Sequence, residues 1–467
     1  MFARWWVALL VSLWMSTGML TLFGTTVMLP AIADEFKISP STAAWAASIF
    51  PLILAGTFVP GSQLGNLLGF RRVSLIASYT EVFFLIMIFF VPNFVLLITV
   101  RVLSGLFRGA VVPNYQAMAI SQFPDEERGK ALGAISGLSG FGSLFTLAIA
   151  GIITDLWGWR WVFLLSAASF FIINLLVTFT FPSGSKGRQS QGNLRQFDLS
   201  GAIWLMLCVA LLLVGIQMIG REGTGLWPLG LILLGIVFVI LLIRFEARQV
   251  RPVLPVALFK DRAVSIPSWF NFLFTFTNGI SLYLLPILFI QGLGWTAAYA
   301  GSILIALNAA RPFGSVTSGF LSDRFGPSPV VIGATIVLIS SVLSLAFWGT
   351  AGALLVLIPM LVMFGFGQSL FATANLKQMY AAVPDSLLAF APGALGLGRH
   401  IATTAGIGIA STVFAAFLLG GQFLTEVDAV SAAFRIIFIV TAGFVIIGVF
   451  APLGLSFGLS RFSNPNR

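Results

Sequence analysis

The sequence predicts an all-α integral membrane protein with fourteen transmembrane helices. Its mean hydropathy is +1.02, and apolar residues make up 58% of its 467 residues. Charged residues make up 9% of the chain, against about 25% in soluble domains. Apolar runs of about 20 residues, the length that crosses a bilayer, recur throughout. Because these runs lack strict polar–apolar alternation, they predict helices rather than the strands of a barrel.

The predicted spans follow one another with short polar connections. They are 6–30, 42–66, 72–91, 94–116, 128–153, 159–181, 199–219, 226–244, 264–290, 297–320, 328–348, 350–376, 386–419 and 433–457. Helices packed in a bundle tolerate the Pro and Gly residues inside several of these spans. The first run is too long for a cleavable signal peptide and lacks a small-residue cleavage site, so we expect it to be the first span.

The basic residues are distributed unevenly between the loops. With the N-terminus placed in the cytoplasm, the outer loops hold only Lys37, Arg160, Arg221 and Arg435, and most other basic residues lie on the cytoplasmic side. The positive-inside rule therefore predicts a multi-pass protein of the cell (inner) membrane with both termini in the cytoplasm. The same rule explains the net charge of +10 without a nucleic-acid partner.

A repeated segment divides the chain. Ser62–Arg72 resembles Gly319–Gly326, and their matching glycines, Gly69 and Gly326, are 257 positions apart (326 − 69 = 257). The same offset relates the starts of spans one to five to those of spans nine to thirteen. We therefore expect three parts: a six-helix bundle (1–181), a cytoplasmic linker at Pro182–Gln196 followed by two inserted helices (182–263), and a second six-helix bundle (264–467). Two related bundles with a midplane site between them are common in secondary transporters.

Several motifs carry a family resemblance. The segment Gly319-Phe-Leu-Ser-Asp323-Arg324-Phe-Gly326 resembles the Gly-x-Leu-x-Asp-Arg-x-Gly loop of the major facilitator superfamily. Further matches to its fourteen-span drug:proton antiporter branch are Arg101 with Gly105, Trp157-Gly-Trp-Arg160, Phe197-Asp198-x-x-Gly201 and Gly398-Arg399-His400. The resemblance implies the major facilitator fold, two six-helix bundles plus a two-helix insert. It also implies transport, with spans one, four, nine and twelve lining a central cavity.

The chain departs from that branch at three positions. Thr21 stands near the place of an acidic residue in the first span. The segment Thr146–Gly151 replaces the antiporter signature Gly-Pro-x-x-Gly-Gly, and Asn66 replaces the aspartate of the first loop motif. The resemblance therefore implies proton antiport less strongly than it implies transport.

Charged residues inside the spans are candidates for substrate binding or coupling, because a charge near the bilayer centre is costly. Four arginines and one glutamate qualify, namely Arg101, Arg108, Arg311, Arg399 and Glu81. Guanidinium groups pair well with carboxylate and phosphate, so the excess of arginine indicates a cavity that attracts anions. The alternative is that these arginines bind helix carbonyls or extend to an interface. Glu81 is a candidate proton carrier, and an internal ion pair with an arginine is the alternative.

Uncharged polar residues complete the candidate set. Asn271, Asn278, Gln368 and Asn375 lie on spans nine and twelve, and His400 follows Arg399. They fit a cavity lining, although polar contacts that only hold helices together give the same pattern. For His400 a hydrogen-bonded structural role is the alternative. Gating is predicted for Asp323 with Arg324, and in a weakened form for Asn66 with Arg71, because a carboxylate at a helix junction can cap a helix N-terminus.

Two transport functions remain open. The first is proton-coupled efflux of small hydrophobic or amphiphilic compounds, the multidrug type. The second is a carrier for organic anions or lipid-like acids that is not a proton antiporter. No catalytic motif is present, and a single histidine excludes a multi-histidine metal site, so we expect neither an enzyme nor a cofactor. The expected partners are a small-molecule substrate, membrane lipid and protons, with the chain acting as a monomer.

Overall fold

The structure is a computed structural model that describes residues 2–38, 40–43, 45–180, 196–218, 225–249, 252–295, 297–384, 387–419 and 426–460. Every regular element among them is a helix, which confirms the predicted all-α class. The predicted linker Pro182–Gln196 falls outside these ranges except for its last residue.

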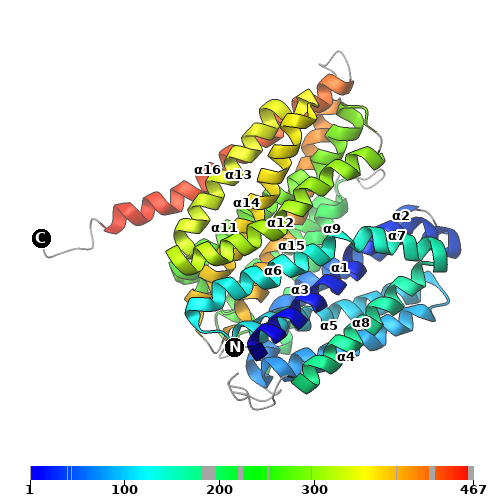
Figure 1. Cartoon of the computed structure of the whole chain (residues 1–467), viewed down its shortest axis with the longest axis vertical. Helices are drawn as coiled ribbons and strands as arrows, with labels where there is room; N and C mark the ends of the chain where they lie inside the picture. The colour runs from blue at the N-terminus through cyan, green and yellow to red at the C-terminus, as the bar shows by residue number, and fades with distance from the viewer. Residues whose placement is uncertain are drawn as a thin grey trace, which may run out of the picture.

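The helices form two bundles and an insert (Figure 1). The N-bundle comprises α1 (Phe2–Phe36), α2 (Pro40–Ala43), α3 (Trp45–Leu68), α4 (Phe70–Phe89), α5 (Phe94–Ile120), α6 (Arg128–Leu144), α7 (Thr146–Trp157) and α8 (Trp159–Thr180). The insert is the hairpin of α9 (Leu199–Met218) and α10 (Trp227–Glu246). The C-bundle comprises α11 (Arg262–Ile287), α12 (Ala297–Phe325), α13 (Pro327–Trp348), α14 (Leu354–Ala382), α15 (Phe390–Leu419) and α16 (Glu426–Ser460).

Among the described residues, 11 helices are long and apolar enough to cross a membrane. They coincide with predicted spans, and the predicted spans without such a helix are 128–153, 297–320 and 386–419. Span 128–153 is divided into α6 and α7 by a break at Phe145, and the two pieces have 17 and 12 residues. Helices α12 and α15 are long but rich in Gly, Ser and Thr. A multi-pass membrane protein is thus supported, and the count of fourteen stays a prediction.

The repeated sequence segment forms the same turn twice. Gly69 joins α3 to α4 with φ +92°, and Gly326 joins α12 to α13 with φ +82°. Both values lie in the left-handed region that side chains with a Cβ rarely adopt. The structure therefore explains why the two matching segments both have glycine at this turn.

The two bundles meet along two seams. On one seam α6 packs against α12 and α14, and on the other α15 packs against α3 and α5. Helix α9 contacts both α3 and α15, so the insert lies along the second seam and touches both bundles. Figure 1 shows the two bundles meeting near the N-terminus and diverging toward the end marked by α2 and α7.

A cluster of polar contacts closes the base of the insert. Asp198 Oδ1 accepts hydrogen bonds from the Gly201 amide at 2.8 Å and the Ser200 hydroxyl at 2.6 Å, which caps the first turn of α9. Glu246 at the end of α10 is 1% exposed and accepts from the Leu254 amide at 3.3 Å. A Cβ added at Gly201 would overlap Glu246 Oε1 and lie 2.6 Å from Asp198 Oδ2. The Phe197-Asp198-x-x-Gly201 motif therefore joins the two inserted helices.

We expect Gly201→Ala to destabilise the protein, because the added methyl group would displace the Glu246 carboxylate from its buried place. Small-to-large changes in tight packing cost about 1–3 kcal/mol. The measurement is thermal unfolding of the detergent-solubilised protein. Gly230→Ala, on the same hairpin where nothing lies within 4 Å, is the control and should unfold near the wild-type temperature.

Candidate functional site

Asp323 connects the two bundles. Its Oδ1 accepts from the Gly129 amide at 2.9 Å and from Lys377 Nζ at 2.6 Å, and its Oδ2 accepts from the Lys130 amide at 2.8 Å. Gly129 and Lys130 lie in the first turn of α6, whose amides have no partner within the helix. The carboxylate on α12 therefore caps a helix of the opposite bundle, where the helix dipole favours negative charge. We call Asp323, Lys377 and these two amides the Asp323 clasp.

The other predicted gating residues are placed differently. Arg324 is exposed and its guanidinium lies over the Phe325 ring at 5.2 Å rather than on Asp323. Arg71 donates to the Thr178 carbonyl at the end of α8 at 2.9 Å. Asn66, the repeat equivalent of Asp323, has a buried Oδ1 with no recorded partner. The structure thus shows a cross-bundle clasp at the second loop motif, and no matching contact of Asn66 is recorded among the described residues.

Glycines bring α6 and α12 together beside the clasp. A Cβ on Gly319 would lie 2.5 Å from the Gly129 carbonyl, and a Cβ on Gly133 would lie 2.7 Å from the Ser315 carbonyl. Farther along, Phe141 and Phe313 pack edge to face with ring centroids 5.5 Å apart. Beyond Phe145 the chain continues as α7, whose main contacts lie within the N-bundle. The α6–α12 seam is therefore closed from the clasp to about the level of Phe313.

The second seam ends near His400. Glycines at 393 and 396 of α15 pack against Phe58 of α3, and the His400 ring stacks on Phe58 with centroids 5.6 Å apart. Arg399, next to this last contact, is exposed. Farther along α15, Gly406 packs against Phe276 within the C-bundle and Gly408 against Ile216 of the insert. Arg399 thus lies at the end of the α3–α15 seam. Arg311 has the corresponding place on the α6–α12 seam, two residues from the Phe313 contact.

Three predicted residues meet in the C-bundle. Arg311 on α12 donates through Nη2 to Asn278 Oδ1 on α11 at 3.1 Å and to Gln368 Oε1 on α14 at 2.7 Å. Gln368 Nε2 also donates to Asn278 Oδ1 at 3.0 Å. All three side chains are half-buried, and none of the ion pairs recorded among the described residues involves Arg311. We call Arg311, Asn278 and Gln368 the Arg311 triad.

The remaining C-bundle amides hold helices together. Asn271 donates to the Leu395 carbonyl of α15 at 2.9 Å, and Asn375 on α14 donates to the Pro267 carbonyl of α11 at 3.0 Å. Both side chains are buried. Their recorded bonds match the structural alternative rather than the lining of a cavity.

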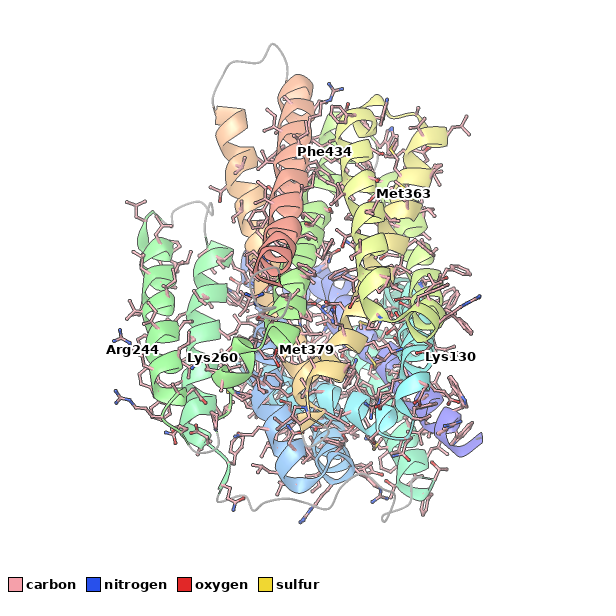
Figure 2. All side chains as sticks on the ribbon, turned by 90° about the vertical axis from the view of Figure 1, so that its left-hand side faces the viewer. Lys130, Arg244, Lys260, Met363, Met379 and Phe434 are labelled. Atoms are coloured by element: carbon pink, nitrogen blue, oxygen red, sulfur yellow. The ribbon has the colours of Figure 1, made fainter. Side chains whose placement is uncertain are left out.

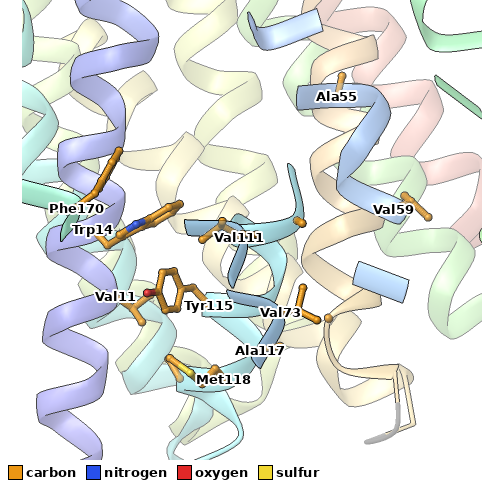
Figure 3. Close-up of a cluster of buried hydrophobic side chains, with 14 of the residues drawn as sticks. Val11, Trp14, Ala55, Val59, Val73, Val111, Tyr115, Ala117, Met118 and Phe170 are labelled. Atoms are coloured by element: carbon orange, nitrogen blue, oxygen red, sulfur yellow. The ribbon is translucent and has the colours of Figure 1, made fainter. Parts of the chain in front are cut away.

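Glu81 and Arg108 form an ion pair inside the N-bundle. Arg108 Nη1 lies 3.1 Å from Glu81 Oε1, with side chains 6% and 0% exposed. The guanidinium lies over the rings of Trp14 at 4.0 Å and Phe170 at 4.9 Å, and Gly18 of α1 leaves the room that it occupies. Figure 3 shows Trp14 between Phe170 and Tyr115 within this core. The pair is therefore sealed by aromatic rings, and Glu81 Oε2 has no recorded partner.

Arg101 is also buried, but it has no acidic partner among the recorded pairs. Its Nε donates to the Ala46 carbonyl at 3.0 Å and its Nη1 to the Thr21 carbonyl at 3.3 Å. The rings of Phe50 and Phe163 flank it at 4.9 and 5.4 Å. The arrangement matches the alternative in which a guanidinium binds helix carbonyls.

Sequence reasoning missed Lys377 as part of the clasp and Trp14 as the cover of the buried ion pair. In the sequence, Lys377 is recognisable only as a basic residue at the end of a predicted span.

Figure 2 places Lys130, Arg244 and Lys260 at similar heights, toward the end of the molecule opposite Phe434. These basic residues therefore gather toward the same end as the clasp.

Comparisons with known proteins identify the family. The model of the Major Facilitator Superfamily matches residues 9–407. Riboflavin transporter RibZ of Clostridioides difficile is 24% identical over 89% of this chain and 90% of that protein. Quinolone resistance protein NorB of Staphylococcus aureus is 27% identical over 83% of each chain. The human organic anion transporter MFSD10 shares the fold, with a TM-score of 0.64 at 15% identity over 95% of this chain and 97% of the other. The chain belongs to the Major Facilitator Superfamily and is a membrane transporter rather than an enzyme.

Proposed function

We propose that the protein is a secondary transporter that exports small hydrophobic or amphiphilic compounds across the cell membrane by alternating access, coupled to protons. The observation that carries the proposal is the Asp323 clasp, a set of polar contacts that joins the two bundles at one end of the molecule. Alternating access requires such a contact to form in one state and to break in the other.

The position of the clasp suits this cycle. The bundles touch from the clasp to the Phe141–Phe313 contact, and the half-buried Arg311 and exposed Arg399 lie at the limit of the two seams. The state described by the structure therefore has its clasp end closed. By the positive-inside rule this end faces the cytoplasm, and both termini lie on that side. This orientation goes with the fourteen spans predicted from the apolar runs. Relatives named for multidrug and quinolone resistance support export as the direction.

A transport assay at imposed pH gradients tests this function. Inside-out vesicles that contain the protein are incubated with a cationic dye or with an organic acid in the medium, and the accumulation of each inside the vesicles is followed with and without the gradient. Gradient-dependent movement of the amphiphiles is expected. The proposal would be contradicted if vesicles with and without the protein accumulated the same amount of each compound at every pH difference.

A second candidate is a carrier of organic anions without proton antiport. It is favoured by the location of Glu81, which is sealed in the N-bundle by Arg108 and Trp14 rather than placed at the seams. The same assay separates the two candidates. If organic acids move at a rate that does not depend on the pH gradient, and dyes do not move, the second candidate is selected.

Removal of Arg399 should change which charges the transporter accepts. Because this exposed guanidinium attracts anions, Arg399→Ala should lower the rate for organic acids relative to cationic dyes by about tenfold. Arg435→Ala, an exposed arginine of α16 that bonds Thr350, is the matched control. An unaltered acid-to-dye ratio in Arg399→Ala would show that Arg399 does not select substrates.

A further inference from the structure

The Arg311 triad has an unusual balance of donors and acceptors. A guanidinium has donors and no acceptor, so it orients the oxygens of both amides toward itself. Asn278 Oδ1 receives bonds from Arg311 and Gln368, and Gln368 Oε1 receives one from Arg311. Both amide oxygens of the triad are therefore engaged.

The unused polar atoms of the triad are all donors. They comprise Arg311 Nε and Nη1, Asn278 Nδ2 and the second hydrogen of Gln368 Nε2, for which no acceptor is recorded among the described residues. Arg311 Nε is also buried without a partner. A buried donor without a partner costs about 1–3 kcal/mol, and more when it is charged. A ligand that satisfies these atoms must bring acceptors, and it gains most if it brings negative charge.

The charge balance leads to the same ligand. Arg108 has Glu81 as its acidic partner, whereas the recorded partners of Arg311 in the described part of the chain are two neutral amides. A cation placed at the triad would face a full positive charge that no ion pair recorded among the described residues compensates, which is unfavourable at low dielectric. The three residues come from α11, α12 and α14, so the site is fixed by helices rather than loops.

From this we propose that the Arg311 triad is the subsite that binds the carboxylate of an amphiphilic organic acid during transport. The proposal deepens the proposed function and rests on it, since it names the acidic group that the substrate carries. Asn278 and Gln368 act as positioning residues, because they hold the guanidinium in place and add their own N–H donors.

Binding of three naphthalene derivatives tests the proposal. Naphthoate, naphthylmethanol and naphthylmethylammonium share an apolar body and differ in the charge of the head group. Their apparent affinities are measured from the thermal stability of the detergent-solubilised wild type, Arg311→Gln and Asn278→Asp. Naphthoate should bind wild type best. In Arg311→Gln its affinity should fall about tenfold to a hundredfold, and in Asn278→Asp the added carboxylate should reverse the preference toward the ammonium compound.

Two further variants complete the experiment. Ser302→Asp adds the same charge nine residues from Arg311 on α12, at an exposed serine whose recorded bond is to its own helix, and should leave the naphthoate preference intact. Arg311→Lys keeps the charge and should keep part of the preference, so the test does not depend on the folding of one variant. Equal naphthoate binding by wild type and Arg311→Gln, or no naphthoate binding by wild type, would overturn the proposal.

The binding test needs neither a membrane nor a gradient, so its failure is distinguishable from failure of the transport function. Dye movement in vesicles without naphthoate binding would count against the acid subsite alone. Naphthoate binding without movement of any compound would count against transport alone.

Discussion

Replacement of Asp323 with asparagine is expected to lower the transport rate at least about tenfold while the protein stays folded in the membrane. The carboxylate accepts from two amides of α6 and from Lys377. Asparagine keeps a single acceptor oxygen and turns an N–H group toward one of these donors. Loss of one charge-assisted hydrogen bond costs about 1.5–3 kcal/mol, and 1.4 kcal/mol is a factor of ten in population. The population of the state with the clasp closed, relative to the open state, should therefore fall at least about tenfold.

The control for this variant is Arg324→Gln. Arg324 follows Asp323 in the motif but lies over Phe325, away from the clasp. Its loss should change the transport rate less than twofold, although the sequence motif pairs the two residues. Wild-type turnover in Asp323→Asn, measured with equal amounts of protein in the vesicles, would show that the clasp does not hold the closed state.

The single cysteine of the chain allows the conformational change to be measured directly. Cys208 is buried in α9. Once it is replaced by Ala, a cysteine introduced elsewhere is the single thiol of the chain, so all maleimide labelling comes from that position. Ser315 is 5% exposed and lies in the α6–α12 seam next to Gly133. In detergent, Ser315→Cys should react with maleimide faster in the Asp323→Asn protein than in the protein with Asp323. Equal labelling rates would contradict a shift toward an open clasp end.

The sequence predicted features that depend on local chemistry. Apolar runs predicted the helices, and a repeated motif located Gly69 and Gly326, whose positive φ angles require glycine at both turns. Asp323 was identified because an acidic side chain at a helix junction can cap a helix. The sequence did not reveal that the capped helix is α6 of the other bundle, because that contact joins residues 194 and 193 positions apart.

Other features depend on packing that no single segment encodes. Lys377 reaches Asp323 only because α12 and α14 lie side by side, and the Arg311 triad needs three helices to meet. The break at Phe145 forms although the Gly-Pro signature of the drug:proton antiporter branch is absent from this segment of the sequence. Here Gly142 lies against Ser16, and Gly24 lies against Ala150 on the far side of the break, so α1 packs closely against both α6 and α7.

Breaking the Glu81–Arg108 pair from one side is expected to cause the largest loss of stability. In Glu81→Leu, Arg108 keeps its charge in a site that is sealed by Trp14 and Phe170, with no other acidic partner recorded. Loss of one member of a buried ion pair costs about 3–5 kcal/mol. The free energy of unfolding in mixed micelles, measured by detergent titration, should fall by that amount. An unchanged free energy of unfolding would show that water or lipid reaches Arg108.

The double variant separates burial of charge from loss of packing. Glu81→Leu with Arg108→Met removes both charges and keeps apolar bulk, so most of the lost stability should return. Arg435→Met removes an exposed arginine and should stay within about 0.5 kcal/mol of wild type. If the double variant also exports amphiphiles with wild-type dependence on the pH gradient, the pair serves folding alone. If it folds and transports but no longer responds to the gradient, the Glu81–Arg108 pair takes part in proton coupling.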